Sequence, residues 1–285
     1  GGYFVDCSLR LDRLASHQRY GVLVLGDPDR TVTVSKQADP ADCWQIDNGL
    51  LVMQVAARFC GSAISLRRGG VELLRSAFPE ARPLAWENPW HGGIEPSLGA
   101  VGRELFKEHF TARAITRKGE QGVVWKGVRV SCAPRADRGR HLSLALDYLL
   151  APGSSVLAVA VRTTRRAGAS GWVDGGFMVW PVLGGSHLDA VLRASDDDRS
   201  ERFQCGLHGH VQGQRWVMAE NPKAGEAAVL AGHPDHTWIN STTFGRDGYF
   251  LAAGRGEHHE AKQTQESVFF LAFTGADRAR DLAEV

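Results

Sequence analysis

The sequence predicts an all-β protein, a large antiparallel β-sandwich with one short C-terminal helix. Short runs with the two-residue alternation of strands recur along the chain, turn signals separate them, and extended helical periodicity is nearly absent. Glycine contributes 33 of the 285 residues, as expected where many tight turns join strands. The length suffices to bury a core, and no linker or fixed repeat divides the chain. We therefore expect a single domain over residues 1–285.

The clearest element is a hairpin over residues 142–162. Leu142, Leu144, Leu146 and Tyr148 alternate with small or polar residues, which is typical of a half-buried strand. A Pro-Gly turn follows, and residues 156–162 are apolar on both faces, as in a strand packed between layers. The two runs predict adjacent antiparallel strands.

Further strands are predicted on both sides of this hairpin. The candidates are residues 50–55, 63–66 with 71–74, 128–132, 215–219, 249–253 and 267–273. Residues 1–44 form a β-rich N-terminal extension around Gly26-Asp27-Pro28-Asp29. Only the tail indicates helix, with Thr274 as a cap, Asp277 three residues later, and Leu282 and Val285 on one side.

Charge and hydropathy argue against two classes of partner. Thirty-three Lys and Arg against 32 Asp and Glu give a net charge of +1, which disfavours a general nucleic-acid or anionic-membrane surface. No run approaches the length of a membrane span, and the N-terminus lacks the order of a secretory signal. We expect a cytoplasmic protein, whose Gly-Gly start is consistent with processing or trimming.

Neither metal nor cofactor is predicted. The five cysteines, Cys7, Cys43, Cys60, Cys132 and Cys205, are far apart and odd in number, which argues against a disulfide framework or a cysteine zinc site. Histidines gather at 208–210, 233–236 and 258–260 without H-E-x-x-H spacing, so surface loops explain them more simply. No P-loop, dinucleotide-binding glycine motif or G-x-S-x-G elbow occurs.

The densest group of reactive and binding side chains lies in residues 78–96. Four prolines and a Gly-Gly pair predict a long loop without regular structure, and such loops are often functional. Trp86 and Trp90 offer flat apolar faces for the C–H face of a sugar ring, whereas Glu87, Asn88, His91 and Glu95 can bind hydroxyl groups. His91 titrates near neutral pH and Glu95 lies four residues later, so the two could serve as an acid and a base. The alternative is a rigid loop whose tryptophans fill the core.

Two more regions could contribute aromatic faces. Residues 171–187 contain Trp180 and His187 near a predicted strand end, and residues 237–241 place Trp238 next to an amide. Core packing explains these residues equally well. Arg165-Arg166 and residues 135–140 are short basic runs that fit solvated hairpin ends, although arginine also binds carboxylate-bearing sugars.

The order of these segments resembles the galactose mutarotase-like superfamily, the β-supersandwich of aldose 1-epimerases. The resemblance covers residues 45–275 and rests on Ile46-Asp47-Asn48-Gly49, residues 59–64, His91-Gly92-Gly93, Trp125-Lys126-Gly127-Val128, the 142–162 hairpin and residues 176–181. It implies that His91, Gly92 and Gly93 bind sugar. The family's second histidine lies in an Asn-His-x-Tyr-Phe-like strand, where this chain has Phe177-Met178-Val179-Trp180-Pro181. The resemblance places the family's glutamate base late in the chain, at Glu257, Glu260 or Glu266.

Three functions are compatible with these residues. An isomerase would interconvert sugar anomers by proton transfer, a lyase or glycosidase-associated domain would act on a polysaccharide, and a binding module would use only a Trp- and His-lined cleft. The isomerase is the leading expectation, with a mono- or oligosaccharide as ligand. Its catalytic candidates are His91, Glu95 and Glu257; its sugar-binding candidates are Trp86, Glu87, Asn88, Trp90, Gly92, Gly93, Trp180 and Trp238.

Overall fold

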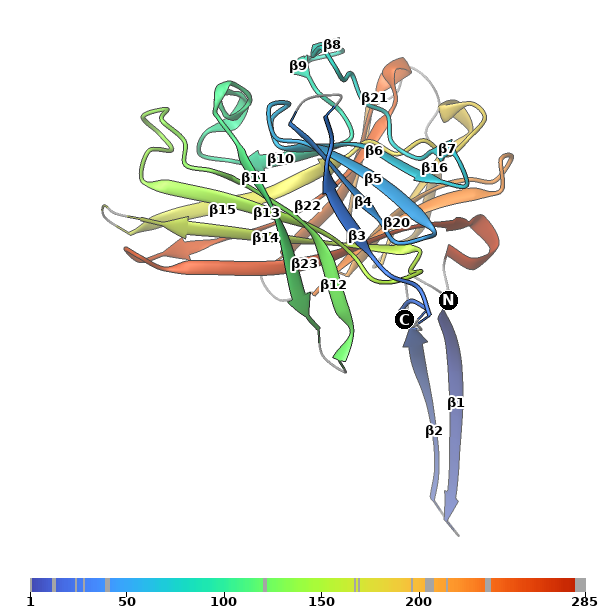
Figure 1. Ribbon diagram of the computed structural model, residues 1–285. Coiled ribbons are helices and arrows are strands. Elements are labelled where there is room, and N and C mark those ends of the chain that lie inside the picture. The colour runs from blue at the N-terminus through green and yellow to red at the C-terminus, as the bar shows by residue number, and fades with distance from the viewer. Residues whose placement is uncertain are drawn as a thin grey trace.

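Two large antiparallel sheets face each other across one core (Figure 1). The computed structural model describes residues 2–279 except 12, 13, 24, 28, 39–41, 120, 121, 167, 169, 196, 203–207, 214 and 234–236. This architecture confirms the predicted all-β sandwich.

The first sheet has ten strands. Its order is β18-β21-β22-β15-β10-β6-β5-β4-β3, with β7 paired to β6. The bounds along the chain are β3 Thr33–Lys36, β4 Cys43–Asp47, β5 Leu51–Ala56, β6 Ser62–Arg68, β7 Val71–Glu72, β10 Ile94–Leu98, β15 Gly171–Val179, β18 His208–Gly213, β21 Thr237–Phe244 and β22 Tyr249–His259.

The second sheet has nine strands in the order β11-β12-β13-β14-β23-β20-β19-β16-β17. The bounds are β11 Thr111–Lys118, β12 Val124–Cys132, β13 Leu142–Leu150, β14 Val156–Arg165, β16 Val191–Ala194, β17 Asp197–Arg202, β19 Trp216–Asn221, β20 Glu226–Gly232 and β23 Thr264–Gly275.

Two hairpins and three short 3₁₀ helices complete the described chain. β1 (Gly2–Leu11) and β2 (Leu14–Leu23) pair only with each other and project from the sandwich (Figure 1). β8 (Arg82–Leu84) and β9 (Glu87–Trp90) form a second small sheet. The 3₁₀ helices are η1 (Gly102–Lys107), η3 (His187–Asp189) and η4 (Gly245–Asp247).

The predicted hairpin is confirmed as β13 and β14, which lie in the nine-stranded sheet. Leu142, Leu144, Leu146 and Tyr148 all point into the core. The Tyr148 hydroxyl lies 3.0 and 3.1 Å from the carbonyl oxygens of Gly61 and Ile94, next to β6 and in β10. This side chain therefore links the two sheets through the middle of the core.

The prediction of an unstructured loop over residues 78–96 was wrong. The prolines fall between or at the open edges of short strands, so β8, β9 and the start of β10 fit among them. β10 pairs with β6 only at Ile94, which leaves its edge open beyond that residue, and proline is tolerated at such edges. Pro96 can therefore lie in the strand opposite Phe177 of β15.

The C-terminal helix begins at residue 276 and is described as far as residue 279. Leu282 and Val285, predicted on one side of this helix, lie outside the described residues.

Candidate functional site

The ten-stranded sheet has a face turned away from the core, here called the outer face. On β15 and β22, odd-numbered residues such as Phe177 and Leu251 lie in the core. Neighbouring residues alternate in direction along a strand, so the even-numbered residues occupy the outer face. The register aligns Gly176 with Gly254 and Gly254 with Trp238. The partly exposed outer-face residues include Ser97, Asp174, Met178, Trp238, Asn240, Thr242 and Phe250.

Trp238 is fixed on the outer face by a hydrogen bond and by a glycine. Its indole N–H donates to the Asp174 carboxylate at 2.8 Å. The ring lies over Gly254, where a Cβ atom would stand 2.7 Å from Cε2 of Trp238. Burial raises the pKa of Asp174, and the indole N–H partly opposes this rise. Only glycine at position 254 leaves room for this arrangement.

Two exposed tryptophans extend the outer face at its ends. Trp172 is 65% exposed and lies over Gly256, where a Cβ atom would stand 2.7 Å from its Cζ2. Trp86, in the turn between β8 and β9, is 49% exposed and contacts His208 with ring centroids 5.6 Å apart. The face thus carries three indole rings at separate positions.

Hydrogen-bonding groups lie between these rings. His210 Nδ1 is 3.0 Å from Thr242 Oγ1, and the amide of Asn240 occupies the next outward position on β21. Aromatic planes interspersed with carboxylate, amide, hydroxyl and imidazole groups match a sugar, which has a C–H face and a rim of hydroxyls.

Trp90 and Trp180 belong to an aromatic cluster with Phe244, and their exposed fractions are 0% and 1%. The rings of Trp90 and Trp180 meet edge to face at 5.4 Å, and the guanidinium of Arg75 stacks on Trp90 at 5.1 Å. Both indoles are buried against neighbouring aromatic rings and are not exposed on the outer face. The aromatic cluster packs under the β8–β9 hairpin, whereas Trp86 at the turn of this hairpin is exposed.

Glu95 is completely buried on the outward side of β10. Its Oε1 atom accepts the Gly92 N–H at 2.6 Å, while Oε2 has no hydrogen-bond partner among the described residues. Burial raises the pKa of Glu95 to about 8, against the lowering effect of the Gly92 hydrogen bond. The carboxyl group is therefore mainly protonated at neutral pH.

His91, four residues before Glu95 in the chain, is also buried. Its ring packs between Phe59 and Phe106, at centroid distances of 4.6 and 4.7 Å. Burial lowers the pKa of His91 to about 4, so the imidazole is neutral at neutral pH. Gly92 and Gly93 both have positive φ, and Gly93 packs so closely on the Ala63 carbonyl that no side chain fits. The Gly92 N–H thus holds the Glu95 carboxyl group at the tight turn that follows His91.

Glu257 lies away from Glu95. Glu95 lies level with Ala252 through Met178, and Glu257 is five residues further along β22, roughly 17 Å at 3.4 Å per residue. An odd offset also puts Glu257 on the core side of the sheet, where Arg255 binds its carboxylate at 2.8 Å.

The remaining predicted residues are divided between surface and interior. Glu87 is buried in an ion pair with Arg103 of η1 at 2.5 Å, and Asn88 is exposed. Sequence reasoning did not select Trp172 or Asp174 as ligand-binding residues. The available signal was the alternation of β15, which puts Trp172, Asp174 and Met178 on one face and Val173 and Phe177 on the other.

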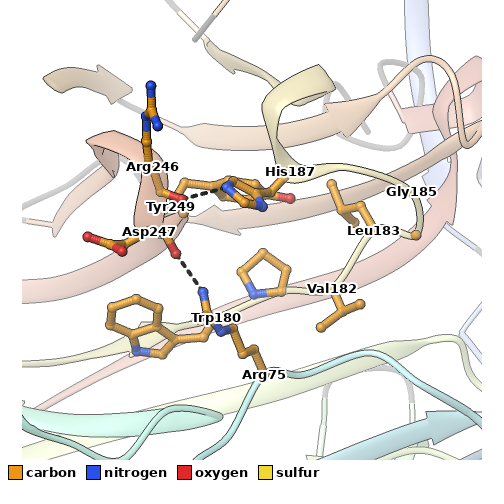
Figure 2. A pocket seen from close by; sticks show the side chains of 12 residues that line it. Arg75, Trp180, Val182, Leu183, Gly185, His187, Arg246, Asp247 and Tyr249 are labelled. Atoms are coloured by element: carbon orange, nitrogen blue, oxygen red, sulfur yellow. Dashed lines mark hydrogen bonds between the residues drawn. The ribbon is translucent and has the colours of Figure 1, made fainter. Parts of the chain in front are cut away.

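A separate pocket of about 300 Å³ lies next to the aromatic cluster, where Trp180 forms part of its wall (Figure 2). Two hydrogen bonds hold the 245–248 turn over it. Arg75 donates to the Asp247 carbonyl at 2.6 Å, and His187 Nε2 lies 2.8 Å from the Arg246 carbonyl oxygen. The Arg246 side chain points away from the pocket (Figure 2). These contacts join three loops at the end of β15.

Within the described part of the chain, no three His, Cys, Asp or Glu side chains are arranged to hold a metal ion. In the same residues, no helix has the length and hydropathy needed to span a membrane.

Comparison with solved structures identifies the fold. A putative aldose 1-epimerase from Klebsiella pneumoniae superposes with a TM-score of 0.65 at 8% identity, covering 90% of this chain and 88% of that one. A galactose mutarotase-like protein from Clostridium acetobutylicum gives a TM-score of 0.59 at 8% identity, covering 87% and 100%. A TPR-domain containing protein from Parabacteroides distasonis gives 0.60 at 12% identity, and the match spans 92% of this chain but only 48% of that one. No protein-family model and no curated protein matches the sequence. The chain has the galactose mutarotase-like fold, as the sequence predicted.

Proposed function

We propose that this protein binds a carbohydrate on the outer face of its ten-stranded sheet. The observation that carries the proposal is Trp238, which is held over Gly254 by its hydrogen bond to Asp174 and is flanked by polar groups. An aromatic ring locked in this way loses little side-chain entropy when a ligand stacks on it. The solved structures named for aldose epimerases and mutarotases support a sugar as the ligand class.

The exposed rings define the extent of the proposed binding surface. Trp172 lies toward one end of β15, and Trp86 lies at the β8–β9 turn beside β18 and β21. The separation of these rings on several strands favours an oligosaccharide or a substituted sugar over a single small ring. His210, Asn240 and Thr242 would bind hydroxyl groups between them.

Saturation-transfer NMR and tryptophan fluorescence with a panel of neutral and acidic oligosaccharides test this proposal. Trp238→Ala and Trp172→Ala should each weaken binding at least about tenfold, because aromatic anchors dominate such interfaces. Trp216→Ala is the matched control, since Trp216 is partly buried on the nine-stranded sheet. Equal affinity in all four proteins would place the ligand elsewhere.

A second proposal is sugar isomerisation, favoured by the protonation states of His91 and Glu95. At neutral pH a neutral imidazole can accept a proton and a protonated carboxyl group can donate one, as anomer exchange requires. Both groups are buried, so the turn containing Gly92 and Gly93 must open before either reaches a sugar.

Exchange NMR between the two anomers separates the proposals. An isomerase would lose about 10²–10⁴-fold in rate on His91→Ala or Glu95→Gln while still binding sugar. Glu257 remains a predicted catalytic residue, and Glu257→Gln tests it in the same assay. If the wild type binds sugar but does not accelerate anomer exchange, only the binding proposal is supported.

A further inference from the structure

Buried polar atoms without partners gather between the two sheets, on the side of the ten-stranded sheet opposite the candidate sugar face. The inter-sheet polar cluster consists of Arg165, Arg255, Glu257, His259, Gln265 and Ser267. Five buried side-chain atoms in it have no hydrogen-bond partner among the described residues: Arg165 Nε, Arg255 Nε, His259 Nδ1, Gln265 Nε2 and Ser267 Oγ. Natural proteins leave few such atoms unpaired, so each calls for a physical explanation.

The register explains why these residues meet. Arg165 of β14 and Gln265 and Ser267 of β23 share the side of the nine-stranded sheet that carries the core residues Val159 and Val161. Arg255, Glu257 and His259 of β22 share the core side of the ten-stranded sheet. The strands reach the same end of the sandwich, where the β22–β23 turn lies beside the end of β14 (Figure 1).

Direct contacts link the two sheets at this end. His259 Nε2 and Gln265 Oε1 are 2.5 Å apart across the sandwich. The Arg165 guanidinium lies directly against Gly171, the register partner of His259, where a Cβ atom would collide with it. Arg165 thus reaches from one sheet to the other.

The charges of the cluster do not balance. Arg255 is paired with Glu257 at 2.8 Å, and His259 lies 3.8 Å from the same carboxylate. Arg165 is only 7% exposed and has no ion pair or side-chain hydrogen bond within the described chain. Burying part of a guanidinium without a counter-charge is unfavourable, and Arg165 Nε is fully buried without a partner in the described chain. The cluster therefore holds two arginines and one carboxylate. Burial, with the charges of Arg165, Arg140 and Arg166, lowers the pKa of nearby His141.

We propose that the inter-sheet polar cluster binds a small anion, a halide or a compact oxyanion such as acetate or phosphate. The Nε–H groups of Arg165 and Arg255 and the amide of Gln265 supply three unpaired donors, and Ser267 supplies a hydroxyl. An anion would satisfy donors from both sheets and neutralise Arg165, whereas water would bind the donors without neutralising this charge. The bound anion would link the two sheets at this end of the sandwich. The site lies on the opposite side of the ten-stranded sheet from Trp238, so the proposal is independent of sugar binding.

Thermal unfolding at fixed sodium concentration and ionic strength tests this site, with chloride or acetate replacing gluconate, which is too large for a compact site. The wild-type midpoint should rise with the concentration of the small anion, by about 2 °C or more once the site is saturated. Arg165→Met should abolish the selective rise. Arg166→Met is the matched control, because Arg166 is an exposed neighbour with the same charge, and it should keep the rise.

A structural measurement covers the case in which Arg165→Met does not fold. Crystals of the wild type grown in bromide should show an anomalous peak within hydrogen-bond distance of the Arg165 guanidinium. The proposal is overturned if bromide is absent there, if wild-type stability depends on ionic strength alone, or if a folded Arg165→Met protein keeps the anion-selective rise.

Discussion

Replacing Glu95 with glutamine should remove a specific pH dependence from the stability of this protein. The pKa of Glu95 is raised from 4.5 to about 8 in the folded state. Between these values the folded protein holds a proton that the unfolded chain has lost. The stability contributed by this proton is complete below pH 4.5 and is lost as the pH rises through 8. At 1.36 kcal/mol per pH unit, the full shift corresponds to about 5 kcal/mol.

The range from pH 6.5 to 8 isolates this effect from that of its neighbour. Because the pKa of His91 is lowered to about 4, the stability that His91 contributes is lost as the pH falls from 6.5 to 4 and is complete above 6.5. Over the 1.5 units from pH 6.5 to 8, wild type should therefore lose about 2 kcal/mol relative to Glu95→Gln. Glutamine keeps an oxygen for the Gly92 N–H and has no proton to lose.

Urea unfolding at half-unit pH steps provides the measurement, with the free energy of unfolding compared between the two proteins at each pH. Glu104→Gln is the control, because Glu104 is exposed and pairs only with Lys107 in the described chain. Its difference from wild type should stay constant across the range. A constant difference for Glu95→Gln as well would show that Glu95 is not protonated in the folded protein.

Two further substitutions test other parts of the structure. Asp147→Asn should destabilise the fold by about 3 kcal/mol in urea unfolding, because Asp147 is buried and its loss leaves Arg129 without its carboxylate partner, whereas Arg117 keeps Glu266; a cost below about 1 kcal/mol would contradict this. Gly93→Ala should cost at least about 2 kcal/mol, since φ is +76° and the new Cβ would collide with the Ala63 carbonyl. Gly69→Ala has a similar φ of +57° with open space around it, so equal costs would show that the collision is unimportant.

Sequence alone predicted the sandwich because its strands carry their own signals. The alternation of Leu142, Leu144 and Leu146 specifies a buried face whatever its partner, and the structure confirms it as β13. The candidate site was less predictable. Trp86 and Trp90 lie four residues apart in a proline-rich segment where alternation is interrupted, so the sequence does not indicate that one is exposed and the other buried. That outcome depends on Trp180 and Phe244, which arrive from distant strands.

The separation of Glu257 from Glu95 could be predicted in part from the sequence. Strand parity places Glu257 with Leu251 and Ala253, which are apolar and buried. What parity could not supply is the alignment of β10, β15 and β22, which sets the distance between the two carboxyl groups. Register of this kind depends on neighbouring strands rather than on local sequence.

The glycines at positions 254 and 256 make the shape of the proposed binding face adjustable without replacing an aromatic residue. A methyl group at either position would stand where an indole now rests and would tilt Trp238 or Trp172 away from the sheet. The two positions lie two residues apart on β22 and contact different indole rings. Alanine or serine at each position therefore gives a small set of differently shaped faces on an unchanged sheet. Directed evolution of the proposed binding face would therefore start best at two residues that contribute no side chain of their own.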